Sequence, residues 1–272
     1  MGWVKPLMIM KTSRTLPDFE NPPLSEVVVG IQFEPPPQYN SVYAGQVWDI
    51  FKTDFPKVVE QPGLMPQFEL FSGGMQGSQM QFGFGGSFMN NRLWFVSQDD
   101  SHLLQFQNDR LLLNWRKNPV GAPYPRFAVL SNSFGGYVEK LQASFSKIFN
   151  FDLRINQAEI SYVNIISVEE MSESGKWLKV GNDSQLKIES FNTTFTEVLM
   201  DEFSRPCGRF YSVCQSDQLG KNIHFSLTCR GKPNGEDIDA GKNFLNFGHE
   251  YIVNKFTELT TKEAHSIWGR NQ

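Results

Sequence analysis

The side chains that could carry metal chemistry are few and scattered along the chain. The four histidines are His102, His224, His249 and His265. None of them has a second ligand at the spacing that zinc sites use. The acidic stretches DDSH (99–102) and GEDIDAG (235–241) are typical of turns, and the second lacks the glycine and the distant glutamate of an EF-hand loop. The sequence therefore predicts no metal ligands and no cofactor.

Motifs for enzymatic catalysis are also missing from the sequence. There is no Walker A loop, no GxGxxG after a strand, no HExxH and no GxSxG elbow. The glycine cluster GFGGSF (83–88) lacks the lysine and the helix start that hold phosphate. A nucleophile needs a base beside it, and the sequence shows no such pair. We therefore predict no catalytic residue, and the sequence favours a protein that is not an enzyme.

Basic residues on and after one predicted hairpin indicate a second kind of chemistry. In LLQFQNDRLLLNWRK (103–117), alternation places Arg110 and Arg116 on one face, with Lys117 and later Arg126 nearby in sequence. Arginine can grip phosphate with two hydrogen bonds, and aromatic rings can stack on bases. However, Trp115 falls on the opposite, apolar face, and the net charge of the chain is −4. Nucleic-acid contact through these four basic residues is therefore an alternative prediction.

A glycine-rich stretch, SGGMQGSQMQFGFGGSF (72–88), holds six glycines and no charge. Its large apolar side chains are Met75, Met80, Phe82, Phe84 and Phe88. Such side chains are costly to leave in water, and methionine and phenylalanine suit adaptable binding surfaces. One hypothesis is a loop that contacts a partner. The alternative is that these side chains fold back into the core or that the loop has no role.

Composition limits the class of protein. The 272 residues are 40% hydrophobic and 20% charged, which is enough for a sizeable core. The three cysteines have no CxxC spacing, so a disulfide framework is not expected and a cytoplasmic location fits best. No apolar stretch reaches 18 residues, so we expect no membrane span. The net charge of −4 does not favour wholesale binding to nucleic acid or anionic membranes.

The period of the apolar residues predicts the elements that must position these side chains. Alternation predicts strands at 27–33, 92–98, 103–116 (a hairpin turning at Asn108-Asp109), 157–170, 185–203, 208–216 and 222–231. Apolar residues at helical spacing predict a short helix at 47–55 and long amphipathic helices at 126–149 and 244–265. The stretch GKPNGEDIDAGKN (231–243) is expected to be a charged, glycine-rich loop.

The order of these elements predicts an α+β fold. We expect antiparallel sheets with long amphipathic helices packed on their faces, because each element has one apolar face to bury. Strand, short helix, strands and long helix occur twice, which suggests two similarly ordered halves in a saddle-like or helix-grip-like arrangement. The expected organisation is an N-terminal arm (1–23), a first half (24–156) and a second half (157–272) that form one compact unit.

Several stretches of the chain carry a family resemblance. They are NPPLSEVVVGIQF (21–33), LWFVSQDDSHLLQFQNDRLLLNWR (93–116), YPRF (124–127), ISYVNII (160–166), GHEYIVNKF (248–256) and AHSIWG (264–269). Together they make the chain similar to a sporadically distributed, uncharacterised bacterial protein family of similar length. The resemblance implies a bacterial cytoplasmic protein with no assigned activity, and patchy occurrence is typical of defence or toxin–antitoxin genes. The loop 72–88 and the N-terminal arm depart from the family pattern.

These observations lead to three functional hypotheses. The first is a non-catalytic binding or regulatory subunit of a bacterial defence or toxin–antitoxin assembly, with a protein partner or a second copy of the chain. The second is a nucleic-acid-binding or RNA-processing protein. The third is a small-molecule sensor with its pocket between the sheet and the C-terminal helix. The fold alone does not choose among them.

Overall fold

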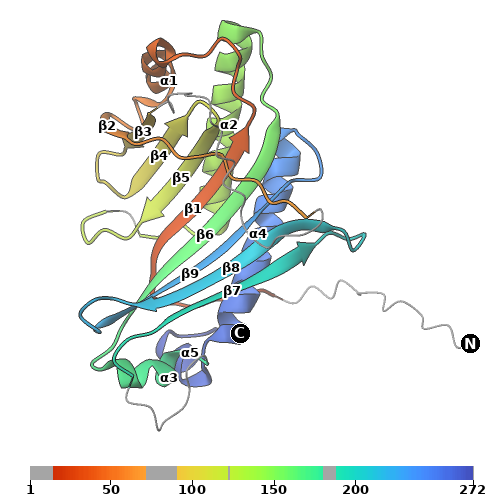
Figure 1. The fold of residues 1–272 in the computed structure, drawn as a ribbon. Helices are drawn as coiled ribbons and strands as arrows, with labels where there is room; N and C mark the ends of the chain where they lie inside the picture. The colour runs from red at the N-terminus through yellow and green to blue at the C-terminus, as the bar shows by residue number, and fades with distance from the viewer. Residues whose placement is uncertain (1–14, 72–90, 122, 180–187, 272) are drawn as a thin grey trace, which may run out of the picture.

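The architecture is a single twisted sheet with helices on one face (Figure 1). The computed structural model describes residues 15–71, 91–121, 123–179 and 188–271. Nine strands lie in the order β2-β3-β4-β5-β1-β6-β9-β8-β7, and every pairing is antiparallel. Their bounds are β1 Leu24–Phe33, β2 Lys57–Gln61, β3 Arg92–Val96, β4 His102–Gln107, β5 Arg110–Arg116, β6 Ile155–Ser167, β7 Asn192–Met200, β8 Pro206–Ser216 and β9 Asn222–Gly231. The prediction of an α+β protein with an antiparallel sheet is confirmed.

The two long helices, α2 and α4, lie behind the sheet as it is drawn in Figure 1, while α3 and α5 lie below it. Their bounds are α1 Ala44–Phe51, α2 Phe127–Phe149, α3 Ser174–Trp177, α4 Ile238–Leu259 and α5 Lys262–Ile267, with short 3-10 turns at Ser41–Tyr43 and Met171–Glu173. The helix α2 packs on β1 and β5, and α4 packs on β6 and β9. Close packing of α4 requires glycine at position 248, because an added Cβ would lie 2.6 Å from the Cγ2 atom of Ile160.

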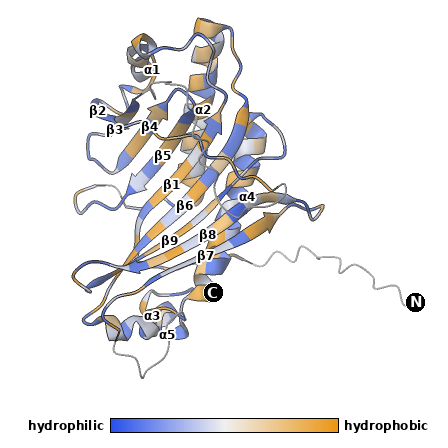
Figure 2. Cartoon of the chain, in the orientation of Figure 1, coloured by the Kyte–Doolittle hydropathy of each residue, from blue (hydrophilic) through white to orange (hydrophobic). Residues whose placement is uncertain are grey.

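The hairpin of β4 and β5 has the predicted register. Asn108 and Asp109 form its turn, and Gln107 lies opposite Arg110. Alternation in this hairpin therefore sorts the side chains between the two faces of the sheet as expected. Hydrophobic and hydrophilic residues alternate along the strands (Figure 2).

Two predicted elements, the C-terminal helix and the strand at 185–203, differ from the structure. The C-terminal helix begins at Ile238 rather than at 244, because the Asp237 side chain accepts a hydrogen bond of 2.7 Å from the Ala240 amide and caps it. The predicted helix 244–265 is also divided, since α4 ends at Leu259 and α5 starts after Thr261. The strand expected at 185–203 is confined to Asn192–Met200 among the described residues.

A further strand, β2, was not predicted at all. It is a five-residue strand at the edge of the sheet, and Val58 and Val59 are both exposed. Its sequence shows no alternation of apolar and polar residues, so periodicity gave no signal.

The polar face of the sheet is partly covered by another segment of the chain. Residues 62–71, which we call the strap, cross in front of the sheet from β2 toward β8 (Figure 1). Gln107 and Arg110 both donate hydrogen bonds to the Leu64 carbonyl oxygen, and they are only 4% and 6% exposed. The helix-facing side carries the apolar core, so the two faces differ sharply in chemistry.

The described part of the N-terminal arm is fixed to the end of the chain. Phe19 forms an isolated bridge with Arg270 and packs edge-on against Phe256. The Asn21 amide donates a 3.0 Å hydrogen bond to the Trp268 carbonyl oxygen. These contacts fix residues 19–21 beside the end of α4 and the residues that follow α5.

Among the helices of the described residues, none has the length and apolar character needed to cross a membrane.

Candidate functional site: a pocket beside the C-terminal helix

A pocket of about 360 Å³ lies between the sheet, the start of α2, the helix α4 and residues 16–22. Most of its wall is apolar and includes Leu16, Leu24, Phe127, Leu227, Ile252 and Phe256. Pockets for small molecules have volumes of roughly 300–1,000 Å³ and mostly apolar walls with a few placed polar groups. The pocket therefore has the size and lining of a small-molecule site.

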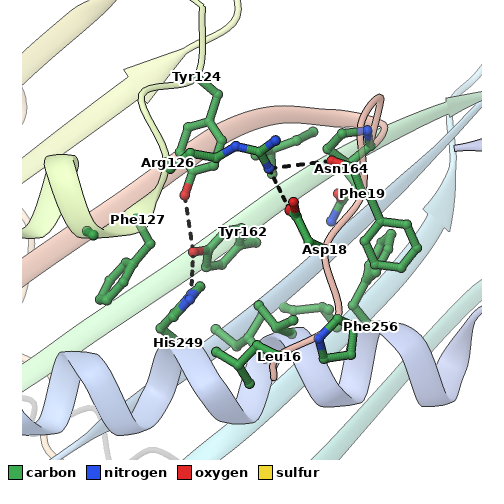
Figure 3. A pocket seen from close by; sticks show the side chains of 17 residues that line it. Leu16, Asp18, Phe19, Tyr124, Arg126, Phe127, Tyr162, Asn164, His249 and Phe256 are labelled. Carbon is green, nitrogen blue, oxygen red and sulfur yellow. Dashed lines mark hydrogen bonds and ion pairs between the residues drawn. The ribbon is translucent and has the colours of Figure 1, made fainter. Parts of the chain in front are cut away.

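Three polar side chains form a row along the pocket (Figure 3). The Tyr124 and Tyr162 hydroxyl oxygens are 3.3 Å apart, and the Tyr162 hydroxyl lies 2.7 Å from Nδ1 of His249. The loop before α2, the middle of β6 and α4 each contribute one member. The Phe127 ring stacks on the imidazole with centroids 4.0 Å apart and planes at 11°, which fixes the orientation of His249.

The three members of the row are neutral at neutral pH. Burial raises the pKa of Tyr124 to about 12 and raises the pKa of Tyr162 well above its usual value. Burial also lowers the pKa of His249 to about 4. The pocket thus presents hydroxyl and imidazole groups without a formal charge along this wall.

The outer nitrogen of His249 is available to a ligand. Within residues 15–71, 91–121, 123–179 and 188–271, no hydrogen bond is made to its Nε2 atom. If Tyr162 donates to Nδ1, Nε2 carries the proton and acts as a donor. If Nδ1 donates to Tyr162 instead, Nε2 becomes an acceptor. The row can therefore match either a donor or an acceptor on a bound molecule.

Arg126 stands at the rim of the pocket in a strained backbone conformation. Its φ of 72° and ψ of 155° lie in a region that is essentially restricted to glycine, at a cost of roughly 1–3 kcal/mol. Its Nη1 atom lies 2.7 Å from Asp18 Oδ1, and both side chains are more than half exposed. An exposed ion pair of this kind contributes little stability. This ion pair therefore does not offset the energetic cost of the strained backbone.

Only one of the four basic residues singled out in the sequence belongs to this pocket. Arg110 is buried and donates two 2.9 Å hydrogen bonds to the Asp109 carboxylate. Arg116 is half-buried at the opposite end of β5, and Lys117 is exposed. Arg126 lies at the pocket rim, on the helix side of the sheet. Arg110 and Arg126 therefore lie on different faces of the sheet and do not form a shared basic surface.

The loop residues proposed for partner contact, Met75, Met80, Phe82, Phe84 and Phe88, lie outside the described residues.

The described residues offer little else that could hold a metal or act as a nucleophile. In them, no group of three or more histidine, cysteine or acidic side chains is placed to hold a metal ion. The three cysteines are free thiols. Burial raises the pKa of Cys214 to about 12, and it also raises the pKa of Cys229, so neither is a reactive thiolate.

Sequence reasoning did not find the polar row. Tyr162 and His249 are 87 positions apart, and no short motif links them. Alternation could have placed Tyr162 on the helix-facing side of its strand, where a tyrosine needs a hydrogen-bond partner. That signal identifies one member of the row but not its partners.

Comparison with models of known protein families found no match to this chain, and comparison with curated protein sequences found none either.

Proposed function

We propose that this chain is a non-catalytic binding protein whose ligand is a small, largely apolar molecule held in the pocket beside α4. The observation that carries the proposal is the combination of an apolar pocket of about 360 Å³ with a neutral polar row on its wall. A ligand with an apolar body and one neutral hydrogen-bonding group matches this chemistry. This is the hypothesis of a small-molecule sensor with a pocket between sheet and C-terminal helix.

The strained rim supports a binding role for the same pocket. Strained residues persist where the surrounding structure holds them, and they cluster at ligand clamps. Arg126 links the loop that carries Tyr124 to the first residue of α2, Phe127, and all three line the pocket. The strained backbone at position 126 is explained if this conformation directs the side chains of Tyr124 and Phe127 toward a ligand.

The stretches that resemble the bacterial family also support this assignment. Four of them contribute to the pocket wall: 21–33 supplies Leu24, YPRF supplies Tyr124, 160–166 supplies Tyr162 and 248–256 supplies His249. A family that shares these stretches would share the pocket. Membership of that family is itself part of the proposal.

The setting in which the protein would act is a wider proposal. A regulatory subunit of a bacterial defence or toxin–antitoxin assembly is compatible with a ligand-binding pocket, since a bound molecule can shift the affinity for a partner. A cytoplasmic location and a protein partner or second copy belong to the same prediction. Nucleic-acid binding stays an alternative prediction, and no contact described above favours it.

We also infer that the sheet consists of two similarly ordered halves, 24–156 and 157–272. In each half the first strand pairs with the last, β1 with β5 and β6 with β9, and a helix of more than 20 residues follows the last strand. The first strands of the two halves pair with each other. This repetition supports the saddle-like or helix-grip-like arrangement with long amphipathic helices, α2 and α4.

The direct test is the small molecule itself. Protein purified from its own host is denatured, and the released molecules are identified by mass spectrometry. Two tryptophan variants on α2 give a matched pair, because Ala128 lines the pocket while Val129 is exposed and does not. We expect release from the wild-type and Val129→Trp proteins and loss of release from Ala128→Trp. Equal release from both variants, or none from the wild-type protein, would contradict the proposal.

A further inference from the structure

The strap, residues 62–71, is bound to the polar face of the sheet through its main chain. Gln107 accepts from the Leu64 amide at 2.8 Å and donates to the Leu64 carbonyl oxygen at 2.9 Å. Gln32 accepts from the Gln67 amide at 3.0 Å. The contacts come from carboxamide side chains of β4 and β1, so this part of the recognition does not depend on the strap's side chains.

Three strap side chains also contact β8 and β9. The Gln67 side-chain oxygen accepts a hydrogen bond from Nη1 of Arg230, and the Arg209 guanidinium lies 4.6 Å from the centre of the Phe71 ring. The Glu69 side chain makes the most hydrogen bonds. The Glu69 carboxylate accepts from Nη1 of Arg209 at 2.5 Å, from Nε of Arg230 at 2.9 Å and from the Tyr211 hydroxyl at 2.8 Å. Arg209 and Arg230 lie opposite each other on β8 and β9. The Glu69 side chain is only 3% exposed, while the two arginines are 21% and 17% exposed. We call Arg209, Tyr211 and Arg230 the carboxylate cradle.

The two arginines of the cradle need two acidic groups to balance their charge. Arg230 also pairs with Glu159 at 2.9 Å, which balances one of the two guanidinium groups. The other positive charge is balanced by Glu69. Without Glu69 the cradle would hold one uncompensated, largely buried positive charge, which is unfavourable. The site therefore requires a carboxylate.

The strap fits this face incompletely. A cavity of about 190 Å³ lies beneath it, with Gln157, Arg110 and Arg230 among its lining residues. The strap residues Phe68 and Leu70 stay exposed, at 45% and 54%. Main-chain contacts and one carboxylate supply most of the hydrogen bonds that hold the strap above this cavity, so another segment with the same pattern could replace it.

We propose that the polar face of the sheet is a binding groove for an extended, glutamate-bearing segment of a partner protein, and that the strap occupies this groove in the absence of the partner. The partner segment would place its carboxylate in the cradle and its main chain against the glutamine side chains. Charge complementarity identifies the occupant, because the cradle balances one acidic side chain and the carboxamides recognise an extended backbone. This groove is separate from the small-molecule pocket and does not depend on it.

The test uses a fluorescent peptide with the sequence of residues 62–71 and a matched peptide with glutamine in place of its glutamate. The full-length chain with Glu69→Gln keeps the shape of the strap but weakens its hold on the cradle. We expect this chain to bind the glutamate peptide at least tenfold more tightly than the wild-type chain does, because Glu69 no longer competes. It should bind the glutamine peptide at least tenfold more weakly than the glutamate peptide.

Two further variants keep the test decisive. Adding Arg209→Ala to the Glu69→Gln chain should abolish the preference for the glutamate peptide. If Glu69→Gln does not fold, Gln107→Ala loosens only the Leu64 end of the strap and should still raise peptide affinity above that of the wild-type chain. Equal affinity for the two peptides, or no binding to either loosened chain, would overturn the proposal. Dimerisation of the loosened chain by strap exchange would assign the groove to a second copy instead of a partner protein.

Discussion

The polar groups on the two faces of the sheet differ in their charge and in how fully they are paired. On the helix-covered face, the Tyr124–Tyr162–His249 row is neutral, and Nε2 of His249 has no partner in the described part of the chain. On the other face, the carboxylate cradle is charged, and Glu69 accepts hydrogen bonds from all three of its members. The difference suggests that the cradle contributes stability in its present state, whereas the pocket row carries unused hydrogen-bonding capacity for a ligand.

The largest expected effect comes from removing the carboxylate on the strap side. Glu69→Ala leaves Arg209 and Arg230 without their shared partner, so we expect the free energy of unfolding to fall by about 3 kcal/mol. Glu69→Gln retains a hydrogen-bond acceptor and should cost less. Urea unfolding followed by circular dichroism measures both. The exposed Glu60 on β2 is the matched control, and Glu60→Ala should change stability by less than about 0.5 kcal/mol. Equal effects of the two alanine variants would show that the cradle contributes no stability.

The contribution of the pocket side to the stability of the protein should depend on pH. The folded-state pKa of His249 is about 4, below the value of about 6.5 that it regains on unfolding. The unfolded chain therefore binds more protons between these values, so stability is present above pH 6.5 and is lost as the pH falls toward 4. From pH 7.5 to 4.5 we expect this residue to account for about 2 kcal/mol of lost stability.

The comparison with His249→Gln isolates that contribution. Burial also lowers the pKa of His102 and His265, so the wild-type chain alone would report all three histidines. The variant keeps a polar side chain but cannot titrate in this range. Its stability should fall by about 2 kcal/mol less than that of the wild-type chain over the same pH interval. Parallel pH profiles for the two proteins would show that His249 is not buried in its neutral form.

Two variants of Arg126 should separate the effect of backbone strain on stability from the effect of this residue on ligand binding. Arg126→Gly removes the Cβ atom that disfavours a φ of 72°, so we expect stability to rise by about 1 kcal/mol. Arg126→Ala loses the same guanidinium group but keeps the strain, and it should show no gain. Both variants should bind the ligand less tightly. A loss of stability in Arg126→Gly would indicate that the ion pair with Asp18 matters more than the strain.

The smallest stability effect is expected for the outer hydroxyl of the row. Tyr124→Phe removes one side of a long 3.3 Å contact, so the free energy of unfolding should change by no more than about 0.5 kcal/mol. Ligand affinity should nevertheless fall about tenfold, which corresponds to about 1.4 kcal/mol for one hydrogen bond. Calorimetric titration of both proteins with the identified ligand provides the measurement. Unchanged affinity would place the ligand away from Tyr124.

Much of the fold could be predicted because it depends on local patterns. The register of Gln107 opposite Arg110 follows from alternation on both sides of a two-residue turn. The start of α4 was missed because its cap, Asp237, lies in a glycine-rich charged stretch that is also typical of a loop. Local patterns therefore identify elements better than they identify the ends of those elements.

The two sites could not be predicted in the same way, because each is assembled from distant segments. Glu69 and Arg230 are 161 positions apart, yet they share a buried ion pair. Alternation places Arg209 and Tyr211 on the face opposite Phe210, but it does not show that a strap returns to meet them. Only the tertiary arrangement of the sheet and the strap reveals these partners.

We expect the pocket beside α4 to hold a ligand while the carboxylate cradle holds the chain's own Glu69. A crystal structure of the protein purified from its host tests both parts in one measurement. We predict continuous electron density for one small molecule between Phe127 and Ile252, within hydrogen-bond distance of Nε2 of His249, and Glu69 in contact with Arg209. A pocket that contains only water, or that is closed by its own side chains, would contradict the proposed ligand binding.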